Sequence, residues 1–158
     1  MILMRKVSLI KLIIVLCFSL GAFGCIFEEN NDSGSSTNIA GTWNATVQVE
    51  TCTPTDVCDA AGFRQGETVT AVMVLSQDGS DVEGTYTYQG TGINADIEGK
   101  INADHLVLNG DVQHPLGRAT VGLVGVVSGS VIEAAVSHNV TIFDGRSGTV
   151  GGSGDFTR

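Results

Sequence analysis

The sequence predicts an all-β protein whose folded domain is an eight-stranded antiparallel up-and-down barrel. Three observations lead to this fold class. Apolar and polar residues alternate repeatedly from Ile39 onward, which is the pattern of half-buried strands. Turn residues recur about every 10 to 15 positions, and no segment shows helical periodicity. The 21 glycines and the frequent valine and threonine also favour strands over helices.

Four strands are predicted in the first half of the domain. The segments 42–50 and 67–77 alternate between apolar and polar residues. A DGSD turn separates the second segment from 82–90, and 92–101 alternates again. On each segment the apolar face holds residues two positions apart: Trp43, Ala45, Val47 and Val49, then Val69, Ala71, Met73 and Leu75, then Val82, Tyr86 and Tyr88, then Ile93, Ala95, Ile97 and Ile101.

Four more strands are predicted in the second half, at 104–112, 118–127, 130–143 and 147–158. Eight glycines lie in the last three of these segments and their turns. Glycine in strands marks bulges, strong coiling or close approach of backbones. Small closed barrels require strong coiling, so the glycines agree with a barrel.

A closed barrel and a two-sheet β-sandwich are the two alternatives for these eight strands. Sequential strands joined by short turns pair antiparallel, and eight of them can close into a barrel that leaves no exposed edge. A two-sheet β-sandwich has the same strand spacing, so it stays open as the alternative.

Residues 1–24 have the three-part layout of a secretory signal peptide. A basic start is followed by an apolar run at 12–20 and by small residues before Cys25. A transmembrane anchor is the alternative, but the uncharged segment 12–27 is shorter than the roughly 20 residues that span a bilayer. We therefore expect export and cleavage.

The stretch Ala22-Phe23-Gly24-Cys25 resembles the lipobox of bacterial lipoproteins. The resemblance implies that the Cys25 thiol receives a diacylglycerol, that cleavage occurs just before it, and that the new amino terminus is acylated. Several acyl chains would anchor the protein stably. The family prefers leucine where Ala22 stands. Because Ile26 follows the cysteine, resemblance to enterobacterial sorting rules implies the outer membrane of the cell envelope.

Residues 25–38 are interpreted as the lipidated cysteine and a flexible tether, and residues 39–158 as the barrel domain. The stretch from Glu28 to Asn38 contains no apolar residue, so it cannot pack into a core. Fully extended, this stretch reaches at most ~40 Å.

The four cysteines divide between these segments. Cys17 leaves with the signal peptide, and Cys25 is expected to be lipidated. Cys52 and Cys58 remain, and such a close pair in an exported chain is expected to form a disulfide. A two-thiolate metal site is the alternative, although zinc sites need four ligands. The pairing of the last two cysteines supports lipidation of Cys25.

Three short motifs are GTW at 41–43, GTYTY at 84–88 and the C-terminal DFTR. They resemble motifs of the calycin barrels, which include lipocalins and avidins. The resemblance implies a calycin-like barrel in which Gly41, Trp43 and Arg158 form a bottom plug, with a cation–π contact of about 0.5–2 kcal/mol. Avidins line their biotin site with several tryptophans, whereas this chain has one. The lipocalin Thr-Asp-Tyr motif and C-terminal helix are absent, and biotin binding is not expected.

Catalytic and metal sites are not predicted, and neither is a cofactor. His105, His114 and His138 have no metal-binding spacing, and the first two are expected in solvated turns. The GGSGD stretch near the C-terminus fails the spacing of a serine nucleophile motif. We therefore expect a protein that is not an enzyme.

Charge argues against nucleic acid as a partner. The formal net charge of the chain is −9, and cleavage before Cys25 removes three positive charges and no acid, which leaves a mature charge near −12. An acidic chain without a basic patch is not suited to phosphate backbones.

Small apolar side chains dominate the predicted inner face, and in an eight-stranded barrel they could leave a cavity for one small ligand. The predicted lining is Ala45, Val47, Val49, Ala71, Met73, Tyr86, Ala95 and Val121. A fully packed barrel is the alternative. The sequence thus predicts a lipoprotein that is anchored to an envelope membrane through its N-terminal lipid. Its barrel either binds a small apolar ligand or is solid and contacts an envelope protein.

Overall fold

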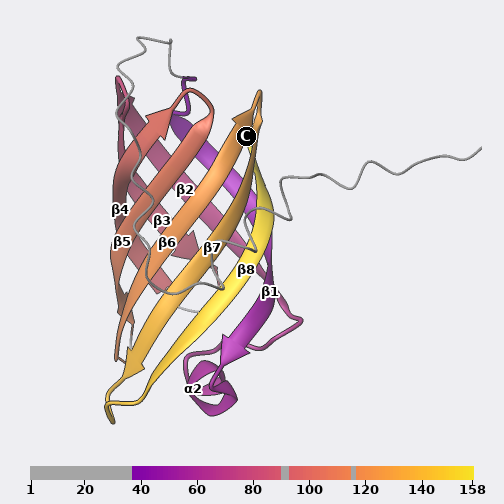
Figure 1. The fold of residues 1–158 in the computed structure, drawn as a ribbon, viewed down its shortest axis with the longest axis vertical. Helices are drawn as coiled ribbons and strands as arrows, with labels where there is room; N and C mark the ends of the chain where they lie inside the picture. The colour runs from indigo at the N-terminus through magenta and orange to yellow at the C-terminus, as the bar shows by residue number, and fades with distance from the viewer. Residues whose placement is uncertain (1–36, 90–92, 115–116) are drawn as a thin grey trace, which may run out of the picture. The chain divides into compact units, whose positions relative to one another are not determined.

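The strands of the protein form one closed antiparallel barrel in the computed structural model, which describes residues 37–89, 93–114 and 117–158. The strands are β1 (Gly41–Thr53), β2 (Thr68–Asp78), β3 (Asp81–Tyr88), β4 (Ile93–Asn102), β5 (His105–His114), β6 (Gly117–Ser128), β7 (Val131–Ile142) and β8 (Ser147–Thr157). Each strand pairs with its neighbour in sequence, and β1 also pairs with β8 (Figure 1). The predicted up-and-down barrel is confirmed, and the β-sandwich alternative is wrong.

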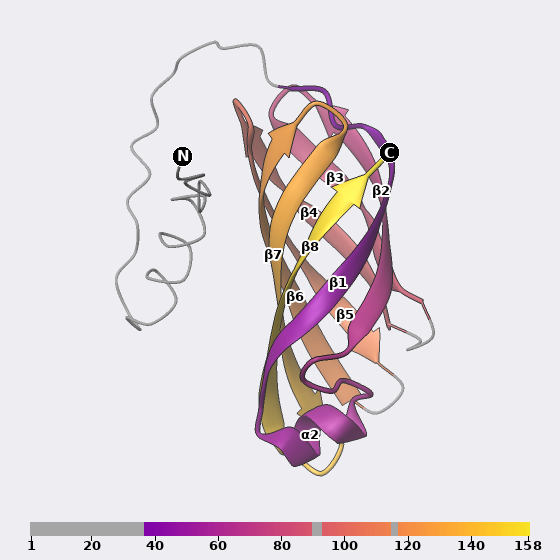
Figure 2. The same ribbon diagram turned by 90° about the vertical axis from the view of Figure 1, so that its right-hand side faces the viewer.

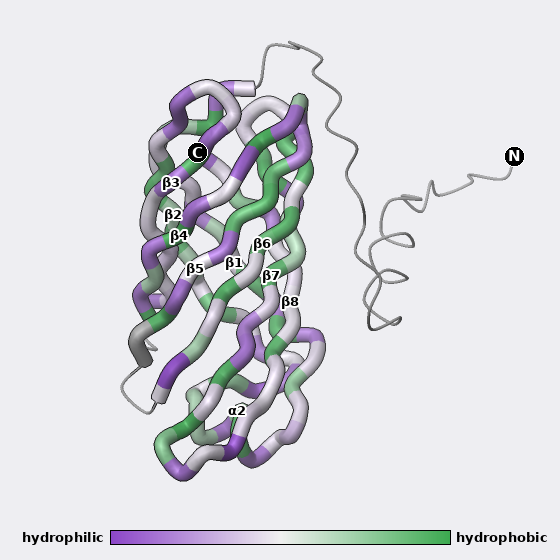
Figure 3. The backbone as a smooth tube through the Cα atoms, turned by 60° about the vertical axis from the view of Figure 1, so that its left-hand side comes forward, coloured by the Kyte–Doolittle hydropathy of each residue, from purple (hydrophilic) through white to green (hydrophobic). Residues whose placement is uncertain are grey.

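The inside and outside of the barrel follow the alternation of the sequence. Along β1 the residues from Trp43 to Val49 are alternately buried and exposed, and β4 and β7 repeat this pattern. Figure 3 shows hydrophobic and hydrophilic positions alternating along the strands. Because successive side chains of a strand point to opposite faces, one apolar set fills the interior.

The seam between the first and last strands closes the barrel. Gly152 and Gly154 of β8 pair with Val49 and Val47 of β1. A Cβ atom on Gly152 would lie 2.4 Å from the carbonyl oxygen of Gln48. One on Gly154 would lie 2.8 Å from the Thr46 carbonyl oxygen. Side chains do not tolerate such short distances to backbone atoms, so the close approach of the two strands depends on glycine.

A short helix, α2 (Thr55–Ala60), lies in the connection from β1 to β2. It covers one end of the barrel, whereas the C-terminus lies at the other end (Figure 2). We did not predict this helix. Its six residues make fewer than two turns, too short for an apolar periodicity to be recognised. Val57 and Cys58 are its buried residues.

The predicted signal peptide, the lipidation site Cys25 and most of the tether lie outside the described residues. The described chain begins beside the turn between β4 and β5, where the Thr37 amide donates to the Ala103 carbonyl oxygen at 3.3 Å. Within the described ranges, no helix has the length and hydrophobicity needed to cross a membrane.

We predict that Gly152→Ala weakens the seam and lowers the free energy of unfolding by about 1–3 kcal/mol, because the methyl group would overlap backbone rather than a movable side chain. Urea unfolding followed by circular dichroism measures this change. The neighbouring Gly151→Ala is the matched control, since its Cβ would meet the side-chain oxygen of Thr51 instead. Equal stabilities for Gly152→Ala and the wild type would contradict the role of this glycine.

Candidate functional site in the barrel interior

The residues predicted to line a cavity all lie inside the barrel. They come from β1, β2, β3, β4 and β6, and their exposed fractions range from 0 to 6%. The set is Ala45, Val47, Val49, Ala71, Met73, Tyr86, Ala95 and Val121. All of them belong to one hydrophobic core, so the structure brings them together.

Large side chains share this interior with the small ones. Trp43, Phe63, Tyr86, Tyr88 and Phe156 are all buried. The interior is therefore more aromatic than the small side chains of the predicted lining suggested.

The Trp43 end of the barrel is covered by the last residue of the chain. The guanidinium carbon of Arg158 lies 4.4 Å from the centroid of the Trp43 ring. Arg158 Nη2 donates to the Asn38 carbonyl oxygen at 2.7 Å, and Trp43 Nε1 donates to the Ile39 carbonyl oxygen at 2.8 Å. Gly41 has a φ of 135°, a conformation that a residue with a side chain rarely adopts. The Gly41, Trp43 and Arg158 positions therefore meet at one end, where the indole is buried and hydrogen-bonded.

The opposite end is covered by the connection between β1 and β2. The predicted disulfide joins Cys52 to Cys58 and ties the end of β1 to helix α2. Gln65 Nε2 donates to the Glu50 carbonyl oxygen at 2.8 Å, and Arg146 forms an ion pair with Asp56. These contacts hold the loop across the end of the barrel.

Phe63 of this loop reaches into the interior. Its ring is 1% exposed and packs edge-to-face on Tyr88, with the ring centroids 5.7 Å apart. It also lies 5.4 Å from the His138 ring, measured between centroids. Phe63 thus separates His138 and Tyr88 from this end of the barrel.

Tyr86, Tyr88 and His138 form a compact cluster beneath Phe63. The Tyr86 and Tyr88 ring centroids are 5.0 Å apart, and Tyr88 lies 5.0 Å from His138. Tyr86 and His138 are separated by 6.1 Å. We call these three residues the Tyr–His cluster.

His138 is the only buried polar or charged residue among the described residues, with an exposed fraction of 1%. Burial lowers its pKa to about 4, because an imidazolium ion would lose its hydration inside an apolar barrel. The side chain is therefore neutral at physiological pH.

The two tyrosines are buried as neutral phenols. Burial raises the pKa of Tyr86 well above its usual value, and the nearby Tyr88 raises it further. Burial also raises the pKa of Tyr88 to about 12. The cluster therefore carries no charge at neutral pH.

Two polar atoms of the Tyr–His cluster have no hydrogen-bond partner. They are Tyr86 Oη and His138 Nε2. The Tyr86 hydroxyl lies close enough to the Tyr88 hydroxyl for a weak side-chain hydrogen bond that raises the pKa of Tyr86, but no hydrogen bond of good geometry joins Tyr86 Oη to any described residue. Buried polar groups are nearly always hydrogen-bonded, so these two atoms call for an explanation.

The interior position of His138 is not among the sequence predictions, although the alternation of β7 indicates it. Ile132, Ala134, Val136, Val140 and Ile142 are the apolar residues of one face of β7. His138 occupies the same even-numbered series. The period of a strand therefore placed the imidazole inside. His105, by contrast, is exposed beside Asp104, as expected.

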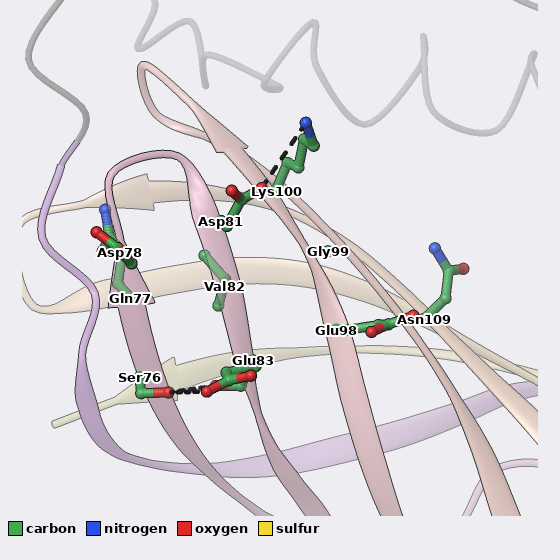
Figure 4. A pocket seen from close by; sticks show the side chains of 10 residues that line it. All are labelled: Ser76, Gln77, Asp78, Asp81, Val82, Glu83, Glu98, Gly99, Lys100 and Asn109. Carbon is green, nitrogen blue, oxygen red and sulfur yellow. Dashed lines mark hydrogen bonds and ion pairs between the residues drawn. The ribbon is translucent and has the colours of Figure 1, made fainter.

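Acidic residues lie on the outer face of the barrel and in its turns. Figure 4 shows a shallow recess on this face, where Ser76 contacts Glu83 and Lys100 pairs with Asp81. Glu83 pairs in register with Glu98, so two carboxylates lie side by side. Like charges in this arrangement are mildly destabilising. Among the described residues, no three His, Cys, Asp or Glu side chains are grouped closely enough to hold a metal ion.

We predict that His138 makes stability depend on pH between about 6.5 and 4. In this range the unfolded chain binds a proton at this residue and the folded protein does not, so acid favours unfolding. This residue has no pH effect on the free energy of unfolding above pH 6.5, and it lowers that free energy by about 3 kcal/mol in total as the pH falls to 4. Urea unfolding at a series of pH values measures it.

His138→Leu removes this dependence, because leucine has a similar volume and does not titrate. His105→Leu is the matched control and should keep the wild-type profile, since His105 is exposed. Parallel pH profiles for the wild type and His138→Leu would contradict burial of a neutral imidazole.

Comparisons with protein-family models, curated proteins and solved structures found no match for the chain. The functional argument therefore starts from the barrel and from the N-terminal sequence. The most distinctive interior feature of the barrel is the Tyr–His cluster, a neutral polar group enclosed by apolar side chains.

Proposed function

We propose that the protein is a lipid-anchored protein of the bacterial cell envelope, placed in the outer membrane, whose barrel binds a small, largely apolar ligand. One observation carries the ligand-binding part. Tyr86 Oη and His138 Nε2 are buried in an apolar interior without a hydrogen-bond partner.

The energetic argument compares this interior with a purely apolar one. An unsatisfied buried polar group costs about 1–3 kcal/mol, whereas a leucine or phenylalanine of similar shape has no such cost. A barrel that served only as a rigid scaffold would be more stable without the two groups. Residues that reduce stability in this way are expected at functional sites. The interior is thus better suited to receive a ligand than to act as a solid core.

The anchoring part is supported by the N-terminal sequence and by the use of the cysteines. The disulfide joins Cys52 to Cys58, which are the two cysteines of residues 39–158. Removal of the signal peptide would take Cys17 away, so Cys25 would have no cysteine partner in the mature chain. Its lipobox-like context offers it a different modification, and acyl chains at the end of a polar tether would hold the barrel at a membrane.

A second function is favoured by a different observation. The aromatic rings of the interior pack with centroids 5.0 to 6.4 Å apart, which is the spacing of direct contact. A solid barrel of this kind could serve as a support whose surface contacts an envelope protein. The following experiment distinguishes the two functions.

We predict that the full-length protein, extracted from bacterial membranes in mild detergent, retains a small molecule at close to one per chain. Native mass spectrometry of the intact protein and chromatography of its organic extract measure the retained molecule. An unrelated lipoprotein prepared in the same way controls for carried-over membrane lipid. Protein that is repeatedly empty would favour the solid barrel.

We also predict that Cys25→Ser abolishes acylation and cleavage at this position. The chain should then keep its precursor mass and incorporate no radiolabelled fatty acid. Cys17→Ser is the matched control, which should be processed and labelled like the wild type. Normal labelling of Cys25→Ser would disprove the anchor.

A further inference from the structure

Tyr86 and His138 approach each other from opposite walls of the barrel. Tyr86 is on β3 and His138 is on β7, four strands apart in either direction around the closed strand order. Their ring centroids are nevertheless only 6.1 Å apart. The two unpartnered atoms therefore belong to side chains that meet across the interior.

We infer that Tyr86 and His138 together bind one uncharged hydroxyl or carbonyl group of the ligand, and that the site rejects carboxylates and amines. This inference rests on the proposed ligand-binding function, because it states which chemical group that ligand carries.

The hydrogen-bonding capacity of the two side chains supports a hydroxyl or carbonyl group. A phenol hydroxyl can donate and accept, and the Nε2 atom of a neutral imidazole does one or the other according to its tautomer. A ligand hydroxyl can complement either arrangement, and a ligand carbonyl can accept from one or both. One such group would satisfy the buried atoms that have no partner within the described residues.

The charge of the interior supports an uncharged group. The groups that face His138 are the rings of Phe63, Tyr86 and Tyr88, and none of them is charged at neutral pH. No buried Lys, Arg, Asp or Glu is present in the described part of the chain. A carboxylate or an ammonium ion would lose its hydration here without gaining a counter-charge, which is strongly unfavourable.

Phe63 indicates where the apolar part of the ligand lies. The rings of the Tyr–His cluster are in contact, so a ligand needs additional space. Phe63 belongs to the loop that covers the barrel end, and its ring contacts both Tyr88 and His138. A ligand ring that replaced the Phe63 ring would lie against His138 and could reach Tyr86 with its polar substituent.

The test creates this space with Phe63→Ala in the full-length protein, since removal of a buried ring leaves an apolar cavity that can bind a small aromatic molecule. The probes are 4-methylphenol, toluene and 4-methylbenzoate at pH 7. Dissociation constants come from the NMR signal of the His138 imidazole in nanodiscs, and empty nanodiscs correct for partitioning of the probes.

We expect Phe63→Ala to bind 4-methylphenol about tenfold more tightly than toluene, which corresponds to one hydrogen bond of about 1.4 kcal/mol. The additional change Tyr86→Phe should abolish this preference. Thr85→Val is the matched control and should keep the preference, because it removes a hydroxyl from an exposed position of the same strand and leaves the Tyr–His cluster unchanged. The methylbenzoate should cause no shift of the signal.

Equal affinity for 4-methylphenol and toluene, or binding of the benzoate, would overturn the inference and leave the proposed ligand binding intact. Failure of folded Phe63→Ala to bind any probe would also overturn the inference. The proposed ligand binding is tested separately, by native mass spectrometry of the molecule that the full-length protein retains. If Phe63→Ala does not fold, the inference is tested by comparing the thermal unfolding midpoint of ligand-free Tyr86→Phe with that of the wild type. An unchanged or raised midpoint supports the inference, and a clear fall would show that the hydroxyl already has a partner.

Discussion

The pairing of β1 with β8 is the constraint on which the rest of the structure depends. It turns a row of hairpins into a closed barrel with a single interior and no exposed strand edge. The pairing of β1 with β8 also places the connection between β1 and β2, which carries the disulfide, next to β7. Val150 of β8 pairs with Cys52 on one side and with His138 on the other. The loop that begins at Cys52 is thereby placed over the strand that carries His138. This arrangement needs a close approach of the two backbones, which the glycines of β8 permit.

The two ends of the barrel are covered in different ways. At the Trp43 end, the indole is buried beneath a guanidinium group, and both side chains are hydrogen-bonded to the backbone of the segment before β1. At the other end, the cover is a loop with a short helix, a disulfide and one inserted phenylalanine. Its polar contacts, such as the ion pair of Arg146 with Asp56, lie at the surface and contribute little in water.

The Tyr–His cluster lowers the stability of the barrel. An imidazole that must stay neutral and a phenol without a partner both reduce the stability of a barrel that apolar side chains could fill. The two side chains lie opposite each other, and the Phe63 ring from the loop contacts His138. The outer face differs, because its paired carboxylates are hydrated and repel each other only mildly.

The sequence by itself determined the strands, their inward faces and the cysteine pairing, because a period of two is a local property and Cys52 and Cys58 are the two cysteines of residues 39–158. Trp43, Met73 and Tyr86 were assigned to the interior from alternation alone, and they are buried there. Only the tertiary structure decided that the sheet closes, because closure depends on the register of β1 against β8, and those strands are far apart in the sequence. It also revealed α2, which is too short to show a period. Above all, it showed that His138 and Tyr86 meet. Two residues on opposite walls become neighbours only when the barrel closes, and their meeting depends on the register of all eight strands.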